Sequence, residues 1–356
     1  MIPQIVFVNF IAVLLVILFH YASGVAPFNN NYFLSVMLKG VNGIITYFFV
    51  LSGFLMTINY YDKQPLNLKR YFSSRFARTY PVYCLALLLW VGPHLLKGID
   101  FQELIKIILT FFLVQSWVPN YSQTYNYPTW FLSVLVFFYI VFPFILSYIT
   151  NKKGTQIFLL VFAVWAFSVI LIFTFYNRPV FMRGHDDFYK LTLFHPIIMY
   201  VNAFIIGIAG GVFLVRNKSV NCPDAIPIIM IVFSLLIISF IISLDTKFTG
   251  GRYYYPNGLL SPAFLMLIVG LSLDKTILSN WLSNKLFIAL GTISYSMYIF
   301  HVPIKIIIQK LFKIDIIKST PLFFSYLIIV IVSSSIIYLF FEKPMRKYIV
   351  SVFNKT

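Results

Sequence analysis

The chain has 356 residues, of which 60% are hydrophobic, 19% aromatic and only 10% charged, and its formal net charge is +17 at pH 7. Soluble domains usually contain about 25% charged residues, so the composition excludes a soluble protein. The basic residues stand singly between apolar runs, which indicates membrane topology rather than nucleic-acid binding. Cys84 and Cys222 match neither disulfide nor metal-site spacing, and we expect no bound metal.

Apolar runs of the ~20 residues needed to cross a bilayer recur almost from end to end. They predict an all-α, polytopic membrane helix bundle of about ten transmembrane helices, forming a single domain over residues 1–356 with no separate soluble domain. No basic leader precedes the first run, so we expect a retained helix rather than a signal peptide. The predicted spans are 4–23, 41–60, 79–96, 129–149, 155–176, 195–215, 225–244, 258–273, 287–308 and 321–341.

Two short basic hinges predict the orientation. An even number of spans places both termini on one side, and the hinges at 151–153 and 216–218 are short loops of the kind on which the positive-inside rule acts. We therefore expect both termini in the cytoplasm. The apolar stretch 104–117 does not fit this parity, so residues 101–117 are either an interfacial or re-entrant segment or an eleventh span.

The loops that would then face outside are polar or rich in tyrosine, as at 119–127, 184–187 and 251–255. One interpretation is the aromatic belt that membrane proteins place at their interfaces. The other is a sugar-binding surface, for which we single out Tyr127 and the nearby Trp130 as substrate contacts.

Two histidines, His20 and His301, fall at the outer part of predicted spans. A polar side chain there costs free energy unless it is partnered or functional. Burial disfavours the imidazolium and leaves the neutral ring that a general base or nucleophile needs. Each could instead be an interfacial histidine bonded to a backbone carbonyl, so both are candidate catalytic residues and nothing more at this point.

Arg75 and Arg78 stand three residues apart and so share one helix face at the predicted cytoplasmic interface. Two guanidiniums can bind phosphates, although a stop-transfer cluster at anionic lipid has the same spacing. The Ser52-Gly53 step is by itself typical of close helix packing. No acidic residue falls mid-span on this map, with Glu342 at the end of the last helix, which argues against an ion-coupled transporter.

His20 is followed along the chain by segments 48–54 (FFVLSGF), 75–78 (RFAR), 129–139 (TWFLSVLVFFY), 204–207 (FIIG), 291–301 (GTISYSMYIFH) and 342–344 (EKP). In this order they resemble the acyltransferase-3 family of membrane acyltransferases, which includes enzymes that O-acetylate bacterial surface glycans. Two departures are Asn9, where many members have arginine, and Leu135, where many have glutamate.

The resemblance implies transfer of an acyl group, with acetyl the first expectation, from cytoplasmic acetyl-CoA to a hydroxyl of a surface polysaccharide such as O-antigen, or of a lipid-linked sugar. It places the protein in the bacterial cytoplasmic (inner) membrane, with membrane lipid but no nucleic acid as partner, and leaves a homo-oligomer open. It also implies that a second transfer step would need a partner protein. The implied roles are donor binding for Arg75 and Arg78, base or acyl carrier for His20, catalysis for His301, and oxyanion donors for Ser52, Ser294 and Tyr298.

Two other functions share this length and aromatic content. A glycan transporter or flippase would need charges that line a central path, which the predicted map lacks. A glycan polymerase would need a large outer loop, and the predicted outer loops are short apart from 97–128. Both alternatives are therefore less favoured than acyl transfer.

Overall fold

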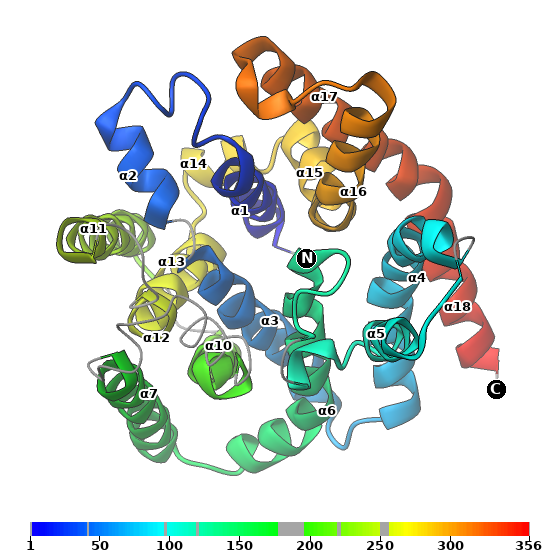
Figure 1. Ribbon diagram of the computed structural model, residues 1–356. Helices are drawn as coiled ribbons and strands as arrows, with labels where there is room; N and C mark the ends of the chain where they lie inside the picture. Colours follow the sequence, from blue (N-terminus) through cyan, green and yellow to red (C-terminus); the bar gives the residue numbers. More distant parts are fainter. Residues whose placement is uncertain are drawn as a thin grey trace. The chain divides into compact units, whose positions relative to one another are not determined.

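The computed structural model describes residues 2–40, 43–95, 98–118, 121–176, 196–218, 222–249 and 256–355, and these residues contain helices and no strand, as predicted (Figure 1). A π-helical turn, Tyr338–Glu342, joins the last two helices. The helices are α1 (Pro3–Tyr21), α2 (Tyr32–Gly40), α3 (Ile44–Tyr60), α4 (Leu68–Leu95), α5 (Phe101–Phe111), α6 (Trp130–Thr150), α7 (Gly154–Tyr176), α10 (Pro196–Arg216), α11 (Ala225–Thr249), α12 (Pro256–Leu259), α13 (Ser261–Leu273), α14 (Ile277–Leu282), α15 (Lys285–Thr292), α16 (Ser294–Phe312), α17 (Thr320–Ile337) and α18 (Lys343–Lys355).

Among the described residues, seven helices are long and apolar enough to cross a membrane, or eight if α15 and α16, bent by 54° at their junction, form one broken span. These helices coincide with eight of the ten predicted spans. The other two predicted spans fall on α4, whose first turns are basic, and on α13, which has only 13 residues. The protein is thus a multi-pass membrane protein, while the count of ten and the cytoplasmic termini stay predictions.

The segment at 101–117 does not form an eleventh span. Its helix, α5, has 11 residues and rises about 16 Å, about half of the ~30 Å hydrocarbon core. Large apolar side chains at Phe101, Leu104, Ile108 and Phe111 are exposed and recur at helical spacing. This amphipathic pattern is typical of a helix that lies in a membrane interface, so the structure favours the interfacial interpretation.

The chain divides into two compact units, and the first comprises residues 1–8, 32–66 and 140–288. Its centre is the contact between α3 and α10, which lie side by side in Figure 1. A methyl group at Gly53 would collide with the backbone oxygen of Phe204, and one at Gly207 with that of Val50. Gly53 and Gly207 therefore allow two backbones to touch, which is the close packing expected for the Ser-Gly step.

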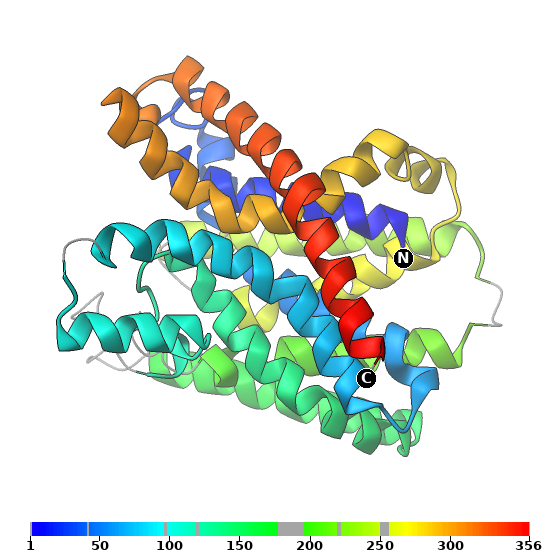
Figure 2. The ribbon, with the colours of Figure 1, turned by 90° about the vertical axis from the view of Figure 1, so that its right-hand side faces the viewer.

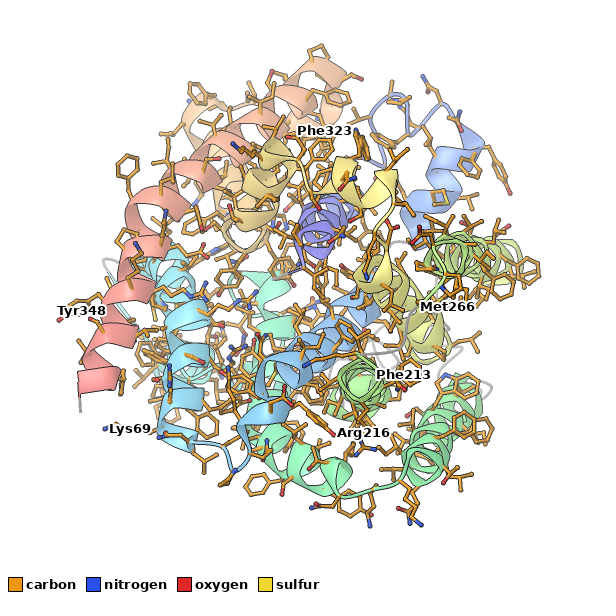
Figure 3. All side chains as sticks on the ribbon, turned by 180° about the vertical axis from the view of Figure 1, so that it is seen from behind. Lys69, Phe213, Arg216, Met266, Phe323 and Tyr348 are labelled. Carbon is orange, nitrogen blue, oxygen red and sulfur yellow. The ribbon has the colours of Figure 1, made fainter. Side chains whose placement is uncertain are left out.

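A second feature of the first unit concerns three of its turns. Arg216, labelled in Figure 3, donates to the backbone carbonyls of Thr150 and Lys152, each at 2.9 Å. Lys218 forms an ion pair of 3.2 Å with Asp62, in the turn after α3. The turns at 61–63, 150–153 and 216–218 therefore lie at the same end of this unit, as the predicted topology requires.

The second unit comprises residues 9–31, 67–139 and 289–356 and contains every predicted site residue except Ser52. In it, α17 continues through the π-helical turn into α18 as one long helix (Figure 2). The α18 part of this helix packs against α4, and α16 packs against both α17 and α4. These elements position the site described next.

Candidate active site

His20 and His301 meet in the second unit. His20 lies in the last turn of α1 and His301 in the middle of α16, and their ring centroids are 5.7 Å apart with the planes within 9° of parallel. His301 is fully buried, whereas His20 is half-buried. The fold thus brings together the two histidines that the sequence singled out separately.

Hydrogen bonding defines the tautomer of His301. Its Nδ1 lies 2.7 Å from the backbone oxygen of Tyr298, and because a carbonyl oxygen only accepts, Nδ1 bears a proton. In the neutral ring, Nε2 then has a free lone pair. This Nε2 is buried and has no hydrogen-bond partner among the described residues. Since buried polar atoms are nearly always bonded, the bare Nε2 is the acceptor that a bound ligand or a proton would satisfy.

Tyrosine side chains surround the histidine pair. The ring of Tyr127 stands edge-on to His20 at 5.0 Å between centroids, and its hydroxyl lies 3.2 Å from that of Tyr21. Tyr326 donates to the backbone oxygen of His301 at 2.8 Å. The predicted substrate residue Tyr127 therefore touches the pair, whereas Tyr21 was missed, although its position directly after His20 was the available signal.

The loop before α6 holds Tyr127 in place through backbone contacts with α16. The side-chain amide of Asn126 donates to the backbone oxygen of Ile299 at 2.8 Å. The Tyr298 hydroxyl donates to the backbone oxygen of Pro128 at 2.7 Å. These bonds explain why a loop residue reaches His20. The other parts of the predicted sugar-binding surface, at 119–120, 184–187 and 251–255, lie outside the described residues.

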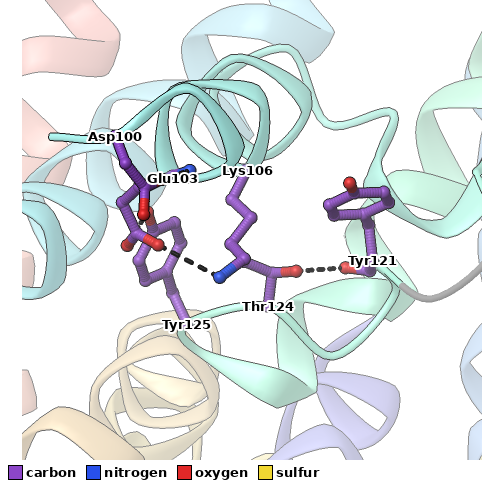
Figure 4. A network of polar contacts seen from close by, with 6 residues as sticks. All are labelled: Asp100, Glu103, Lys106, Tyr121, Thr124 and Tyr125. Carbon is purple, nitrogen blue, oxygen red and sulfur yellow. Dashed lines mark hydrogen bonds and ion pairs between the residues drawn. The ribbon is translucent and has the colours of Figure 1, made fainter.

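The same loop also contacts α5. The Tyr125 hydroxyl donates to Glu103 Oε1 at 2.7 Å, and Lys106 pairs with Glu103 Oε2 at 3.1 Å (Figure 4). Burial, together with the neighbouring Glu103, raises the pKa of the Tyr125 phenol, which keeps it protonated as a donor. Asp100 caps the same helix by accepting from the Glu103 backbone N–H at 2.7 Å.

The predicted oxyanion donors have other partners. The Tyr298 hydroxyl is bonded to Pro128, and Ser294 donates to the backbone oxygen of Gly291 at 2.8 Å. Ser294 also precedes His301 by seven residues, about 10 Å along α16. Ser52 belongs to the first unit, and Trp130 is half-buried at the start of α6. The roles of these four residues stay predictions.

The predicted donor-binding residues Arg75 and Arg78 both lie inside α4 rather than at its start, because α4 begins at Leu68. The Arg75 guanidinium carbon is 5.8 Å from the ring centroid of Tyr139, a cation–π contact. Arg78 is exposed, and it lies close enough to Arg75 and to Arg346 of α18 for their positive charges to repel. Arg346 was not predicted for the site, because only the packing of α18 on α4 reveals it.

Glu342 corrects the predicted map. It was expected at the end of the last helix, but it lies in the π-helical turn within a continuous helix and is buried. Ser296 donates to its Oε2 at 2.5 Å, and Arg78 and Arg346 are close enough to interact with its charge. A carboxylate therefore does lie inside the protein, so the absence of an acidic residue within a span no longer counts against transport. The positive charges of Arg78 and Arg346 lie near this carboxylate.

Beside Glu342 there is a cleft of about 500 Å³ on α18. Three of its lining side chains are basic, so it suits phosphate groups. The lining residues are Tyr338, Glu342, Lys343, Arg346, Lys347, Val350 and Ser351. Among the described residues, no group of His, Cys, Asp and Glu is placed to hold a metal ion.

Contacts along α16 show how far the arginines of α4 lie from the histidine pair. Tyr295, in its first turn, donates to the backbone oxygen of Thr79, which directly follows Arg78. His301 is six residues further along the helix, an axial rise of about 9 Å. One helix thus runs from a basic cluster to the histidine pair.

These features define a multi-pass membrane protein with a stacked imidazole pair, one ring of which is fully buried, and a cluster of guanidiniums. The family model described as an acyltransferase domain matches residues 5–339, and the chain belongs to this acyltransferase family. O-acetyltransferase OatA of Staphylococcus aureus strain NCTC 8325 is 24% identical over 336 residues, which are 86% of this chain and 53% of that protein. A relative from strain COL, named only as a candidate O-acetyltransferase, is 25% identical over 342 residues, 88% of this chain and 54% of its own length.

The chain therefore spans about half the length of the curated relatives it matches. No solved structure matches it.

Proposed function

We propose that the chain is a membrane O-acyltransferase that moves an acetyl group from cytoplasmic acetyl-CoA to a hydroxyl of a surface polysaccharide or lipid-linked sugar. The observation on which this depends is the stacked pair of His20 and His301, with the bare Nε2 of His301 beside it. Membership of an acyltransferase family and the names of the relatives support acetyl transfer to oxygen. The expected location is the bacterial cytoplasmic membrane.

The donor would bind beside the first turn of α16, where the arginines of α4 and α18 lie. Arg75, Arg78 and Arg346 offer three guanidiniums, and guanidiniums bind phosphates bidentately. Glu342, which is bonded to Ser296, offsets part of this charge and restrains the helix on which Arg346 lies. The pantetheine arm of the donor would run between helices towards His20.

At the histidine pair the chemistry would be general-base catalysis. His20 takes the proton from the acceptor hydroxyl, the oxygen attacks the thioester carbonyl carbon, and the carbon–sulfur bond breaks. The departing CoA thiolate then takes the proton from the His20 imidazolium, so atoms and charge balance. In the other route His20 first accepts the acetyl group and then passes it to the acceptor; acetylated enzyme formed without acceptor would distinguish this route.

His301 would assist by accepting a hydrogen bond or the proton at Nε2, and Tyr127 and Trp130 would contact the acceptor. Tyr127 is the better supported of the two acceptor contacts, because its ring touches His20. An acceptor hydroxyl that enters between these side chains would approach the base from the side opposite the arginines.

Mass spectrometry of surface glycans tests this function in cells that express the wild-type chain, His20→Ala, or neither. We expect a mass increase of one or more acetyl groups with the wild type alone. Altered chain length would indicate a polymerase, and loss of exported glycan with no change in acetylation would indicate a transporter. Either result would overturn the proposal.

A further inference from the structure

A lysine that the proposed mechanism does not use lies beside the histidine pair. Lys305 is one helical turn after His301 on α16, and its Nζ is 4.5 Å from the centroid of the Tyr21 ring. Tyr21 directly follows His20, and its ring is 6.1 Å from that of His301. The cation is therefore placed against the rings that form the candidate active site.

No carboxylate pairs with Lys305 among the described residues of its unit, and each acidic side chain there has another partner. Glu103 is bonded to Tyr125 and Lys106, and Glu342 to Ser296. Asp315 accepts from Gln309 at 3.2 Å, and Asp100 caps α5. The face of Tyr21 is thus the one partner that the described structure shows for this cation.

A tyrosine face is a weak partner for a cation in a membrane helix. Ionisable residues in such helices are rare because their desolvation is costly, and they commonly mark substrate paths. A lysine ammonium is a compact charge with three donors, of which a ring face satisfies only part. Together with the unsatisfied, fully buried Nε2 of His301, Lys305 indicates a polar ligand at this position.

The position of Lys305 on α16 distinguishes acceptor from donor. Lys305 is ten residues beyond Tyr295, about 15 Å along the helix, and His301 lies between them. The donor phosphates are assigned to the arginines beside Tyr295. An anion at Lys305 would therefore belong to a molecule that approaches the histidine pair from the other end, which is the acceptor.

We propose that Lys305 binds an anionic group of the acceptor, so that the chain selects acceptors with a carboxylate or phosphate near the hydroxyl that is acetylated. The inference rests on the proposed function. An acidic sugar would supply the carboxylate, and a lipid carrier or phosphodiester would supply the phosphate. Both place an anionic oxygen against the ammonium.

The test uses the full chain in nanodiscs of neutral lipid and two pairs of probes. Cellobiouronic acid is paired with cellobiose, and geranylgeranyl phosphoglucose with the neutral geranylgeranyl glucoside. Binding is measured from the thermal unfolding midpoint without donor, and transfer from the KM of each probe with labelled acetyl-CoA. Variants are Lys305→Gln, Lys305→Arg and the matched control Lys310→Gln, an exposed lysine on the same helix.

We expect the wild type and Lys310→Gln to favour the charged member of one pair by about tenfold in KM, the size of one charge-assisted hydrogen bond. Lys305→Gln should abolish this preference by raising the KM of the charged probe to that of its neutral partner, and Lys305→Arg should retain it in part. The pair that shows the preference identifies carboxylate or phosphate.

Equal effects of Lys305→Gln on charged and neutral probes, or no charge preference in wild-type binding, would overturn the inference; Lys305 would then only extend towards lipid headgroups. The two proposals can fail separately. Charge-dependent binding without acetyl transfer would refute the proposed function alone, and acetyl transfer without charge preference would refute the role of Lys305 alone.

Discussion

The imidazoles of His20 and His301 stack with their centroids 5.7 Å apart and their planes within 9° of parallel, and the Nδ1 proton of His301 is directed at the Tyr298 carbonyl. Two protonated rings at this distance would repel one another. In the proposed mechanism the pair would therefore hold one proton at a time, which suits a base that must accept a proton and then return it.

His301→Asn should distinguish the role of Nε2 of this ring from that of Nδ1. The asparagine amide can still donate to the Tyr298 carbonyl but offers no counterpart to Nε2. We expect kcat for acetyl transfer to fall about 100-fold, the usual size of a general acid–base contribution, with the half-saturating acetyl-CoA concentration unchanged. Steady-state kinetics in nanodiscs check this. A normal kcat together with a lowered unfolding midpoint would instead show that His301 serves stability.

Arg75→Ala and Arg78→Ala should weaken donor binding. Loss of one charge-assisted hydrogen bond to phosphate should raise the half-saturating acetyl-CoA concentration about 10- to 100-fold, with a smaller effect on kcat. Lys69→Ala is the control, because Lys69 is an exposed cation at the start of the same helix (Figure 3). Equal donor dependence in all three variants would reassign both arginines to membrane topology.

Gly53→Ala and Gly207→Ala should destabilise the first unit. A methyl group at either position meets a backbone oxygen of the facing helix, and backbone cannot move aside as a flexible side chain can. Overpacking of this kind costs about 1–3 kcal/mol, so the unfolding midpoint in detergent should fall. Gly92→Ala is the matched control, since Gly92 is also helical and no atom from another part of the structure lies within 4 Å of the added methyl. The close packing of α3 and α10 would be contradicted if the unfolding midpoint fell in the control and not in Gly53→Ala or Gly207→Ala.

Cys222 provides a test of orientation. It follows the turn at 216–218, which the contacts of Arg216 and Lys218 place with two other turns at one end of the first unit. In a Cys84→Ser background, a membrane-impermeant maleimide should label Cys222 in inside-out vesicles and leave it unlabelled in intact cells. Labelling in intact cells would reverse the predicted topology.

The sequence predicted the all-α class and most of the helices that can span a membrane, because runs of apolar residues have a length that the bilayer determines. It also singled out His20, His301, Arg75 and Arg78, since polar groups in apolar runs are conspicuous. It could not distinguish an interfacial helix from a span at 101–117, where composition is ambiguous and the length of α5 decides.

What the sequence could not predict depends on contacts between distant segments. Arg346 joins the basic cluster only because α18 packs on α4, and Glu342 lies within a long helix rather than at its end because α17 continues into α18. The resemblance implied an oxyanion-donor role for Tyr298, but its hydroxyl is bonded to Pro128 in a loop far away in the chain. Lys305 stood in the same run as His301 and was not singled out, because its partner ring comes from α1.

The most direct test is the turnover of His20→Ala, reconstituted in nanodiscs with labelled acetyl-CoA and a glycan acceptor that the wild type acetylates. We expect kcat to fall at least about 100-fold while the unfolding midpoint and the half-saturating acetyl-CoA concentration stay near wild-type values. Near-normal turnover by this variant would contradict acetyl transfer at the histidine pair.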